Sequence, residues 1–152
     1  MNEGKRPGGL TALAVINFIL TGLTLISLLS LAAFFAFIGK VPTDKMDEAA
    51  RVQIEALQGL GTGLFVIIFV LSIVSGLLLL LSGIGYLKQK RILGWGIGNA
   101  YGIIGIISAV ALGFLFPAEL GGGFSISRII DLLYPLITLI LLNTTFKEDF
   151  TE

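Results

Sequence analysis

The sequence predicts an all-α integral membrane protein, a four-helix bundle, from its composition and from four long apolar stretches. Of the 152 residues, 55% are hydrophobic and 13% are charged, and the mean hydropathy is +0.98. A soluble domain carries roughly 25% charged residues, so this chain has about half the charge that a water-facing surface needs. The stretches lack the period-2 alternation of barrel strands, which leaves helices as the structure that satisfies their backbone in lipid.

The four predicted spans cover residues 10–39, 60–87, 92–116 and 124–146, within a single domain of residues 1–152. Each is long enough for a hydrocarbon core of about 30 Å, which takes roughly 20 helical residues. Lys5 and Arg6 precede the first span as they would precede a signal peptide. A secretory apolar region has only about 7 to 15 residues, so we expect an uncleaved first helix.

The distribution of Lys and Arg predicts the orientation, because cytoplasmic loops carry an excess of them. The N-terminal tail, the turn between the second and third spans and the C-terminal tail contain six: Lys5, Arg6, Lys88, Lys90, Arg91 and Lys147. The opposite side contains four: Lys40, Lys45, Arg51 and Arg128. We therefore expect both termini to be cytoplasmic.

The first outer loop, residues 40–59, has the pattern of a short amphipathic helix. Pro42 and Thr43 form a start signal, followed by acidic residues that favour a first helical turn. Four apolar residues then recur at helical spacing on one face: Met46, Ala50, Ile54 and Leu57. This face either covers the end of the bundle or docks a partner protein.

Small residues predict how the helices pack, because association in lipid depends on close backbone approach. The third span carries a stripe of them: Gly94, Gly98, Gly102, Gly105, Ala109 and Gly113. We expect the first or second span to lie against this stripe. The second span has a shorter version in Ser72, Gly76 and Gly83.

Polar residues at similar depth predict a layer inside the bundle. Counted from the basic turn, the layer contains Asn17, Thr21, Ser82, Asn99 and Thr138. Asn17 and Asn99 are expected to face the interior, because a buried amide without a partner costs several kcal/mol in hydrocarbon. The layer either satisfies itself structurally or lines a polar conduit or ligand pocket.

Asp131 is the only carboxylate within a predicted span, and such residues are functional candidates. Tyr134 and Thr138 follow on the same helix face, and Arg128 precedes Asp131 by three residues. Three interpretations are open. Asp131 pairs with Arg128 as an anchor near the outer interface, it binds a partner protein or a lipid headgroup, or it is a protonatable or cation-binding site of a transport path.

The start of the chain, Arg6-Pro7-Gly8-Gly9 followed by a Thr/Ala/Leu-rich turn to Asn17, resembles that of small bacterial four-span membrane proteins of unknown function. The resemblance extends to the Gly-rich end of the second span, which leads through a basic turn to Trp95, and to the tail that ends in Phe150. It implies a bacterial inner (plasma) membrane protein with both termini inside, and it implies no activity.

Composition excludes several function classes. The net charge is zero, so no basic field attracts nucleic acid. The chain has no Cys and no His, which removes thiolate and imidazole metal ligands and the commonest general base, and no metal or cofactor is predicted. We therefore expect a non-enzymatic structural or accessory subunit that packs in the bilayer against another membrane protein or itself. The alternative is a small transporter or ion-conducting unit, which requires an aqueous cavity that reaches Asp131. A lipid-handling enzyme is the third choice.

Overall fold

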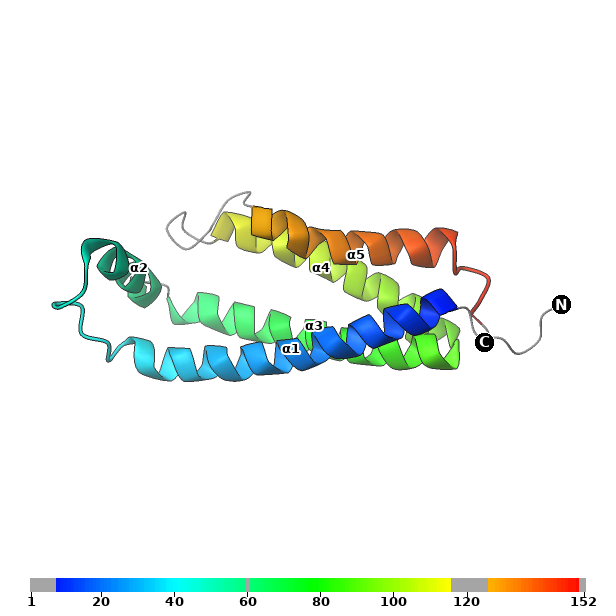
Figure 1. Ribbon diagram of the computed structural model, residues 1–152, viewed down its shortest axis with the longest axis horizontal. Coiled ribbons are helices and arrows are strands. Elements are labelled where there is room, and N and C mark those ends of the chain that lie inside the picture. Colours follow the sequence, from blue (N-terminus) through cyan, green and yellow to red (C-terminus); the bar gives the residue numbers. More distant parts are fainter. Residues whose placement is uncertain (1–7, 60, 116–125, 151–152) are drawn as a thin grey trace.

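A computed structural model describes residues 8–59, 61–115 and 126–150, and this part of the chain is helical with no strand (Figure 1). The elements are α1 (Gly8–Ile38), α2 (Glu48–Gly59), α3 (Thr62–Lys88), the π-helical segment η1 (Arg91–Gly96), α4 (Ile97–Leu115) and α5 (Ile126–Thr144). The predicted all-α bundle, with a short helix in the first loop, is confirmed. Residues 116, 124 and 125, at the edges of the third and fourth predicted spans, lie outside the described residues.

Three helical stretches are long and apolar enough to cross a membrane: Gly8–Ile38, Thr62–Lys88 and Arg91–Leu115. The apolar part of α5, Asp131–Thr144, is shorter. The whole of α5 has 19 residues, which at the usual rise span about 28 Å and so approach the thickness of the hydrocarbon core. The chain is therefore built as a multi-pass membrane protein with three to four spans.

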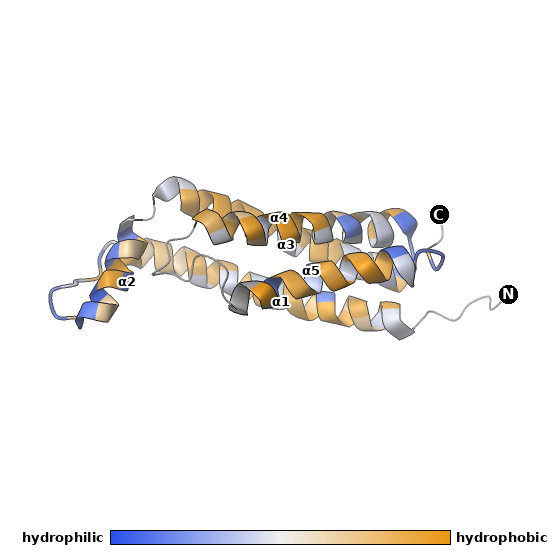
Figure 2. Ribbon diagram, turned by 90° about the horizontal axis from the view of Figure 1, so that it is seen from above, coloured by the Kyte–Doolittle hydropathy of each residue, from blue (hydrophilic) through white to orange (hydrophobic). Residues whose placement is uncertain are grey.

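The two ends of the bundle differ in charge and in the segments that they hold. The start of α1, the α3–η1 turn and the end of α5 lie at one end, which we call the basic end, and α2 lies at the other, which we call the loop end (Figure 1). The helices are apolar along their length, and polar residues gather at both ends (Figure 2). This is the distribution that a bilayer around the middle of the bundle requires.

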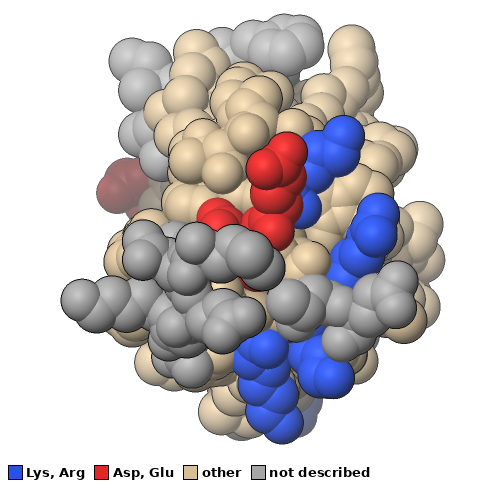
Figure 3. Space-filling view, turned by 90° about the vertical axis from the view of Figure 1, so that its right-hand side faces the viewer, with Lys and Arg blue, Asp and Glu red and all other residues tan. Residues whose placement is uncertain are grey.

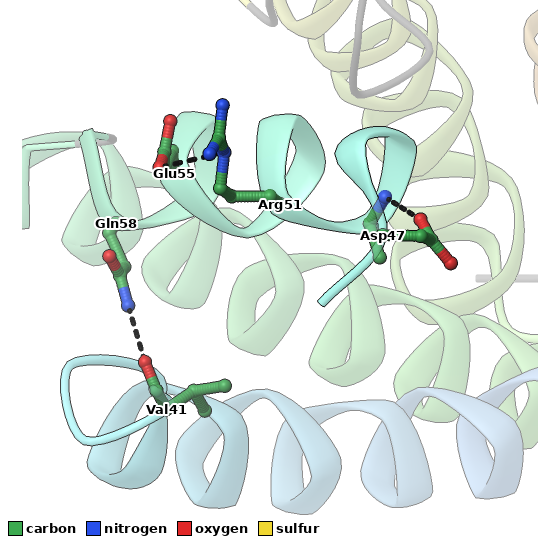
Figure 4. Close-up of polar contacts among 6 residues, drawn as sticks. Val41, Asp47, Arg51, Glu55 and Gln58 are labelled. Atoms are coloured by element: carbon green, nitrogen blue, oxygen red, sulfur yellow. Dashed lines mark hydrogen bonds and ion pairs between the residues drawn. The ribbon is translucent and has the colours of Figure 1, made fainter. Parts of the chain in front are cut away.

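The loop helix α2 begins later than the sequence suggested. The Pro42–Thr43 signal is wrong, because α2 starts at Glu48, and the cap is the Asp47 carboxylate, which accepts a hydrogen bond of 2.8 Å from the Ala50 amide (Figure 4). Gln58 ties α2 to α1 by donating to the carbonyl oxygens of Ile38 and Val41, at 2.9 and 3.4 Å.

The predicted apolar stripe of this loop is its half-buried side. It consists of Met46, Ala50, Ile54 and Leu57, while the remaining residues of α2 except Ala56 are exposed. An ion pair of 3.6 Å between Arg51 and Glu55 lies on the exposed surface. The stripe therefore faces the protein, and no residue of α2 is fully buried.

Helices α1 and α3 form one closely packed pair. A Cβ atom added at Gly83 would lie 3.0 Å from the Phe18 ring and 3.3 Å from Asn17, and one at Gly76 would lie 3.3 Å from Thr24. The small residues of the second span thus provide the room for α1, as their spacing suggests.

The glycine stripe of the third span is shared between two neighbours: Gly94 and Gly98 lie against α3, as expected, whereas Gly102 and Gly105 receive α5, which the sequence did not predict. A Cβ atom at Gly105 would lie 2.9 Å from Pro135, and one at Gly102 would collide with Leu139. Gly98 lies where the two neighbours meet, since a Cβ atom there would collide with Tyr86 of α3 and lie 2.6 Å from Leu142 of α5. Helices α4 and α5 follow one another in the chain, and consecutive helices usually pack side by side. They form the second closely packed pair of the bundle.

The segment after α5 folds back onto the basic end instead of leaving it as a charged tail. Phe146 and Phe150 are both 8% exposed. Phe146 lies over Gly9, and the Phe150 ring packs on Gly94 and lies 6.2 Å from the Tyr86 ring. The core of the basic end therefore includes residues from both ends of the described chain.

Candidate functional site: a cavity that reaches Asp131

Two overlapping cavities of 260 and 380 Å³ lie among α1, α3, α4 and α5, and Asp131 lines both. We call this combined space the Asp131 cavity. All four helices contribute to its wall, so the cavity depends on the way in which the α1/α3 pair meets the α4/α5 pair. Figure 1 shows that these two pairs separate toward the loop end.

The cavity wall carries hydroxyl groups at positions where a lipid-facing surface would be apolar. Its polar side chains are Thr24, Ser27, Ser72, Ser75, Ser108 and Asp131. The rest of the wall is mainly leucine, with Tyr101 and Pro135 near the α4/α5 pair. A group of hydroxyls around one carboxylate can replace part of the hydration shell of a small cation or hold ordered water.

Asp131 lies deeper in the bundle than its place near the start of α5 suggests. It shares the cavity with Thr24, the seventeenth of the 31 residues of α1, and with Ser75, the fourteenth of the 27 residues of α3. Both are at the middle of their helices. Asp131 therefore lies level with the middle of α1 and α3, where an ionised carboxylate needs water or a partner.

A buried polar layer separates the cavity from the basic end. Asn17 and Ser82 are both fully buried, and the Asn17 amide donates a hydrogen bond of 2.8 Å to the Ser82 hydroxyl. The Tyr134 hydroxyl donates to the other polar atom of Asn17, its side-chain oxygen. One amide thus connects α1, α3 and α5, and it is the only hydrogen-bonded link between the two helix pairs at this level among the described residues.

The other predicted members of this layer have separate roles. Thr21 is 9% exposed and its hydroxyl donates to the Asn17 backbone carbonyl at 2.8 Å. Asn99 is half-buried and does not join Asn17. Its amide donates to the Trp95 carbonyl at 2.7 Å, and its side-chain oxygen accepts from Asn143 at 2.5 Å.

The residues of the polar face predicted on α5 belong to two places, the Asp131 cavity and the buried interior next to Asn17. Asp131 is exposed to the cavity, whereas Tyr134 reaches Asn17 and Thr138 is fully buried, with no partner for its hydroxyl among the described residues. The Tyr134 ring lies 6.1 Å from that of Tyr101, which also lines the cavity. The side chain of Arg128 lies outside the described residues, so its predicted pairing with Asp131 stays a prediction.

Three cavity residues were not singled out from the sequence: Ser27, Ser75 and Ser108. A signal for two of them exists, because Thr24 and Ser27 are three residues apart on α1, and Ser72 and Ser75 are three apart on α3. Residues at this spacing share a helix face. Ser108 is a single hydroxyl among small residues, and its role becomes visible only when α4 is placed beside the other helices.

A second, apolar groove of 290 Å³ lies between α1 and α3. Its wall consists of Leu31, Ala32, Phe35, Phe65, Val66 and Phe69, and the Phe35 and Phe65 rings lie 4.4 Å apart. The described residues of its wall are all apolar, so its chemistry suits an acyl chain or an apolar helix face.

The described residues contain no group of three or more acidic side chains that could hold a metal ion. No family model, no curated protein and no solved structure matches this chain.

Proposed function

We propose that this protein is a small transporter or ion-conducting unit that binds a cation at Asp131. The observation that carries the proposal is the cavity itself, because a carboxylate level with the middle of α1 and α3 lines two overlapping spaces of 260 and 380 Å³ together with five serine and threonine side chains. Intramembrane acids that face a polar cavity mark ion and proton pathways in membrane proteins.

The buried polar layer supports a gated path rather than an open pore. Asn17, Ser82 and Tyr134 close the bundle between the cavity and the basic end. A cation that enters from the loop end therefore meets Asp131 first and the Asn17 layer second. Passage requires the α1/α3 and α4/α5 pairs to separate at Asn17, and rearrangements of this kind underlie alternating access.

Replacing Asp131 by asparagine is expected to remove cation flux, because the amide keeps the size of the side chain and loses its charge. The measurement is the rate of H⁺ and K⁺ flux into liposomes that contain the purified protein. We expect the wild type to exceed the D131N variant by at least about tenfold for one of these ions, and D131N to equal protein-free liposomes.

The D44N variant is the control, because Asp44 is an exposed carboxylate in the loop before α2 and does not line the cavity. It should retain the wild-type flux. Background-level flux of both ions for the wild type, or equal flux for wild type and D131N, would contradict the proposed function.

A structural or accessory subunit is the second candidate, and the apolar groove between α1 and α3 is the observation that favours it. Phe35 is 41% exposed beside the buried Phe65 ring, so the groove offers an apolar surface on which a helix of another membrane protein or of a second copy can pack. This role requires a discrete complex in mild detergent. The enzyme alternative has less support, because the described part of the wall combines its serine and threonine hydroxyls with one carboxylate, Asp131, and with no second acid.

We propose further that the protein resides in a bacterial inner membrane with both termini in the cytoplasm. The position of the basic turn at the same end as the start of α1 and the end of α5 supports this orientation. The Asp131 cavity would then face the periplasmic side.

A further inference from the structure

The turn between α3 and η1 carries a cavity that the proposed transport does not use. This cavity has a volume of 560 Å³ and is lined by Lys90, Arg91, Ile92 and Leu93. Of the described residues in its wall, Lys90 and Arg91 are cations and Ile92 and Leu93 are apolar.

The turn is held in one conformation by contacts on its inner side. Gln89 has a positive φ of 51°, and the Lys90 amide donates to the Gly85 carbonyl at 3.1 Å. The Gln89 side chain donates to the Asp149 carbonyl at 3.2 Å, and Phe150 packs on Gly94. The side chains that line the cavity are therefore carried by a fixed backbone, so the ordering cost of binding a ligand falls on the Lys90 and Arg91 side chains and not on the turn itself.

The apolar and charged residues of this cavity lie at the level of the membrane surface. Lys88 ends α3 and Arg91 begins η1, so the turn stands at the boundary of two membrane-spanning stretches. Ile92 is 81% exposed, next to the exposed Lys90 and Arg91. Cations at the headgroup level beside an apolar side chain that faces the acyl region match a ligand with an anionic head and a hydrocarbon tail.

The charge of the end face supports an anionic ligand. Among the described residues the basic end holds four cations, Lys88, Lys90, Arg91 and Lys147, and two acids, Glu148 and Asp149. Figure 3 shows Lys and Arg side chains along one side of this face and a group of acidic side chains nearer to its centre, which adjoins one of the basic side chains. Cations therefore outnumber acids on the described part of this end.

We propose that this cavity binds the phosphate headgroup of an anionic phospholipid, with Lys90 and Arg91 on the phosphate and with Ile92 and Leu93 against the first part of the acyl chains. The site is independent of the Asp131 cavity, which lies on the other side of the Asn17 layer. Phospholipid binding at the turn is therefore expected whether or not the protein conducts cations.

The test is lipid retention by the purified full-length protein, measured by native mass spectrometry with phosphatidylglycerol and phosphatidylcholine as competing probes. We expect the wild type to retain phosphatidylglycerol in preference to phosphatidylcholine. In the K90Q/R91Q double variant, the ratio of retained phosphatidylglycerol to phosphatidylcholine should fall by about fivefold for each cation removed. The K40Q/K45Q variant is the matched control, because it removes two cations from the loop end and should retain the wild-type preference.

Inorganic phosphate distinguishes the lipid from a free anion. Millimolar phosphate should leave phosphatidylglycerol bound, because it supplies no acyl chain for Ile92 and Leu93. Displacement of the lipid by phosphate would overturn the lipid assignment. An unchanged preference in K90Q/R91Q, or an equal loss in K40Q/K45Q, would overturn the site.

Discussion

Replacing Gly85 by alanine is expected to destabilise the bundle by about 3 kcal/mol, near the upper range for a forced overpacking. A Cβ atom at this position would collide with the Gly94 amide and lie 2.5 Å from the Leu93 carbonyl oxygen. These are backbone atoms of the π-helical segment, so no side chain can rotate away. The measurement is the free energy of unfolding in mixed detergent micelles.

The control for this change is G63A, because Gly63 lies in the same helix and a Cβ atom there would meet nothing within 4 Å. It should leave the stability unchanged or raise it slightly, since alanine favours helix over glycine. Equal stability of G85A and G63A would show that the close contact between α3 and η1 does not exist in the membrane protein.

Replacing Asn17 by alanine is expected to cost about 2 kcal/mol, because it removes the acceptor of the half-buried Tyr134 hydroxyl and the donor to the buried Ser82 hydroxyl, which keeps only its bond to the Leu79 carbonyl. The cost exceeds that of a typical hydrogen bond between membrane helices, about 0.6 kcal/mol, since one side chain serves two helices. The measurement is again the free energy of unfolding, now for N17A, Y134F and the double variant.

The double variant separates the free energy of the hydrogen bond between Tyr134 and Asn17 from the other effects of the two substitutions. If Tyr134 acts through Asn17, the loss in N17A/Y134F is smaller than the sum of the two single losses. N143A is the control, because Asn143 bonds Asn99 in an exposed position and should cost less than N17A. Additive losses in the double variant would contradict the link between α1 and α5.

Most of the fold could be predicted from the sequence because bilayer thickness and apolar content act along the chain. The spans at 10–39, 60–87 and 92–116 agree with the observed helices within two residues wherever the chain is described. The stripe through Gly98 and Gly102 also showed correctly that α4 packs closely. The stripe could not show which helix packs against α4, because a groove lined by small residues accepts any helix of suitable shape.

The site was harder to predict, because its depth depends on how far each helix extends past its neighbours. Asp131 is the sixth residue of the described α5 and was expected near the outer interface. α1 has 31 residues and α5 has 19, so the start of the shorter helix lies level with the interior of the longer one. The docking of Phe150 was missed for a different reason, since one aromatic residue after three charged ones follows no helical period.

Water access to the Asp131 cavity tests the central proposal most directly, and the absence of Cys from the chain makes single-cysteine variants unambiguous. Ser108 lines the cavity, whereas its neighbour Ile107 is 61% exposed on the outside of the bundle at the same depth. A membrane-impermeant thiol reagent reacts with the thiolate, which forms in water and not in hydrocarbon. We expect S108C to be modified at least about tenfold faster than I107C in the reconstituted protein, and equally slow reaction of both would contradict a water-filled cavity.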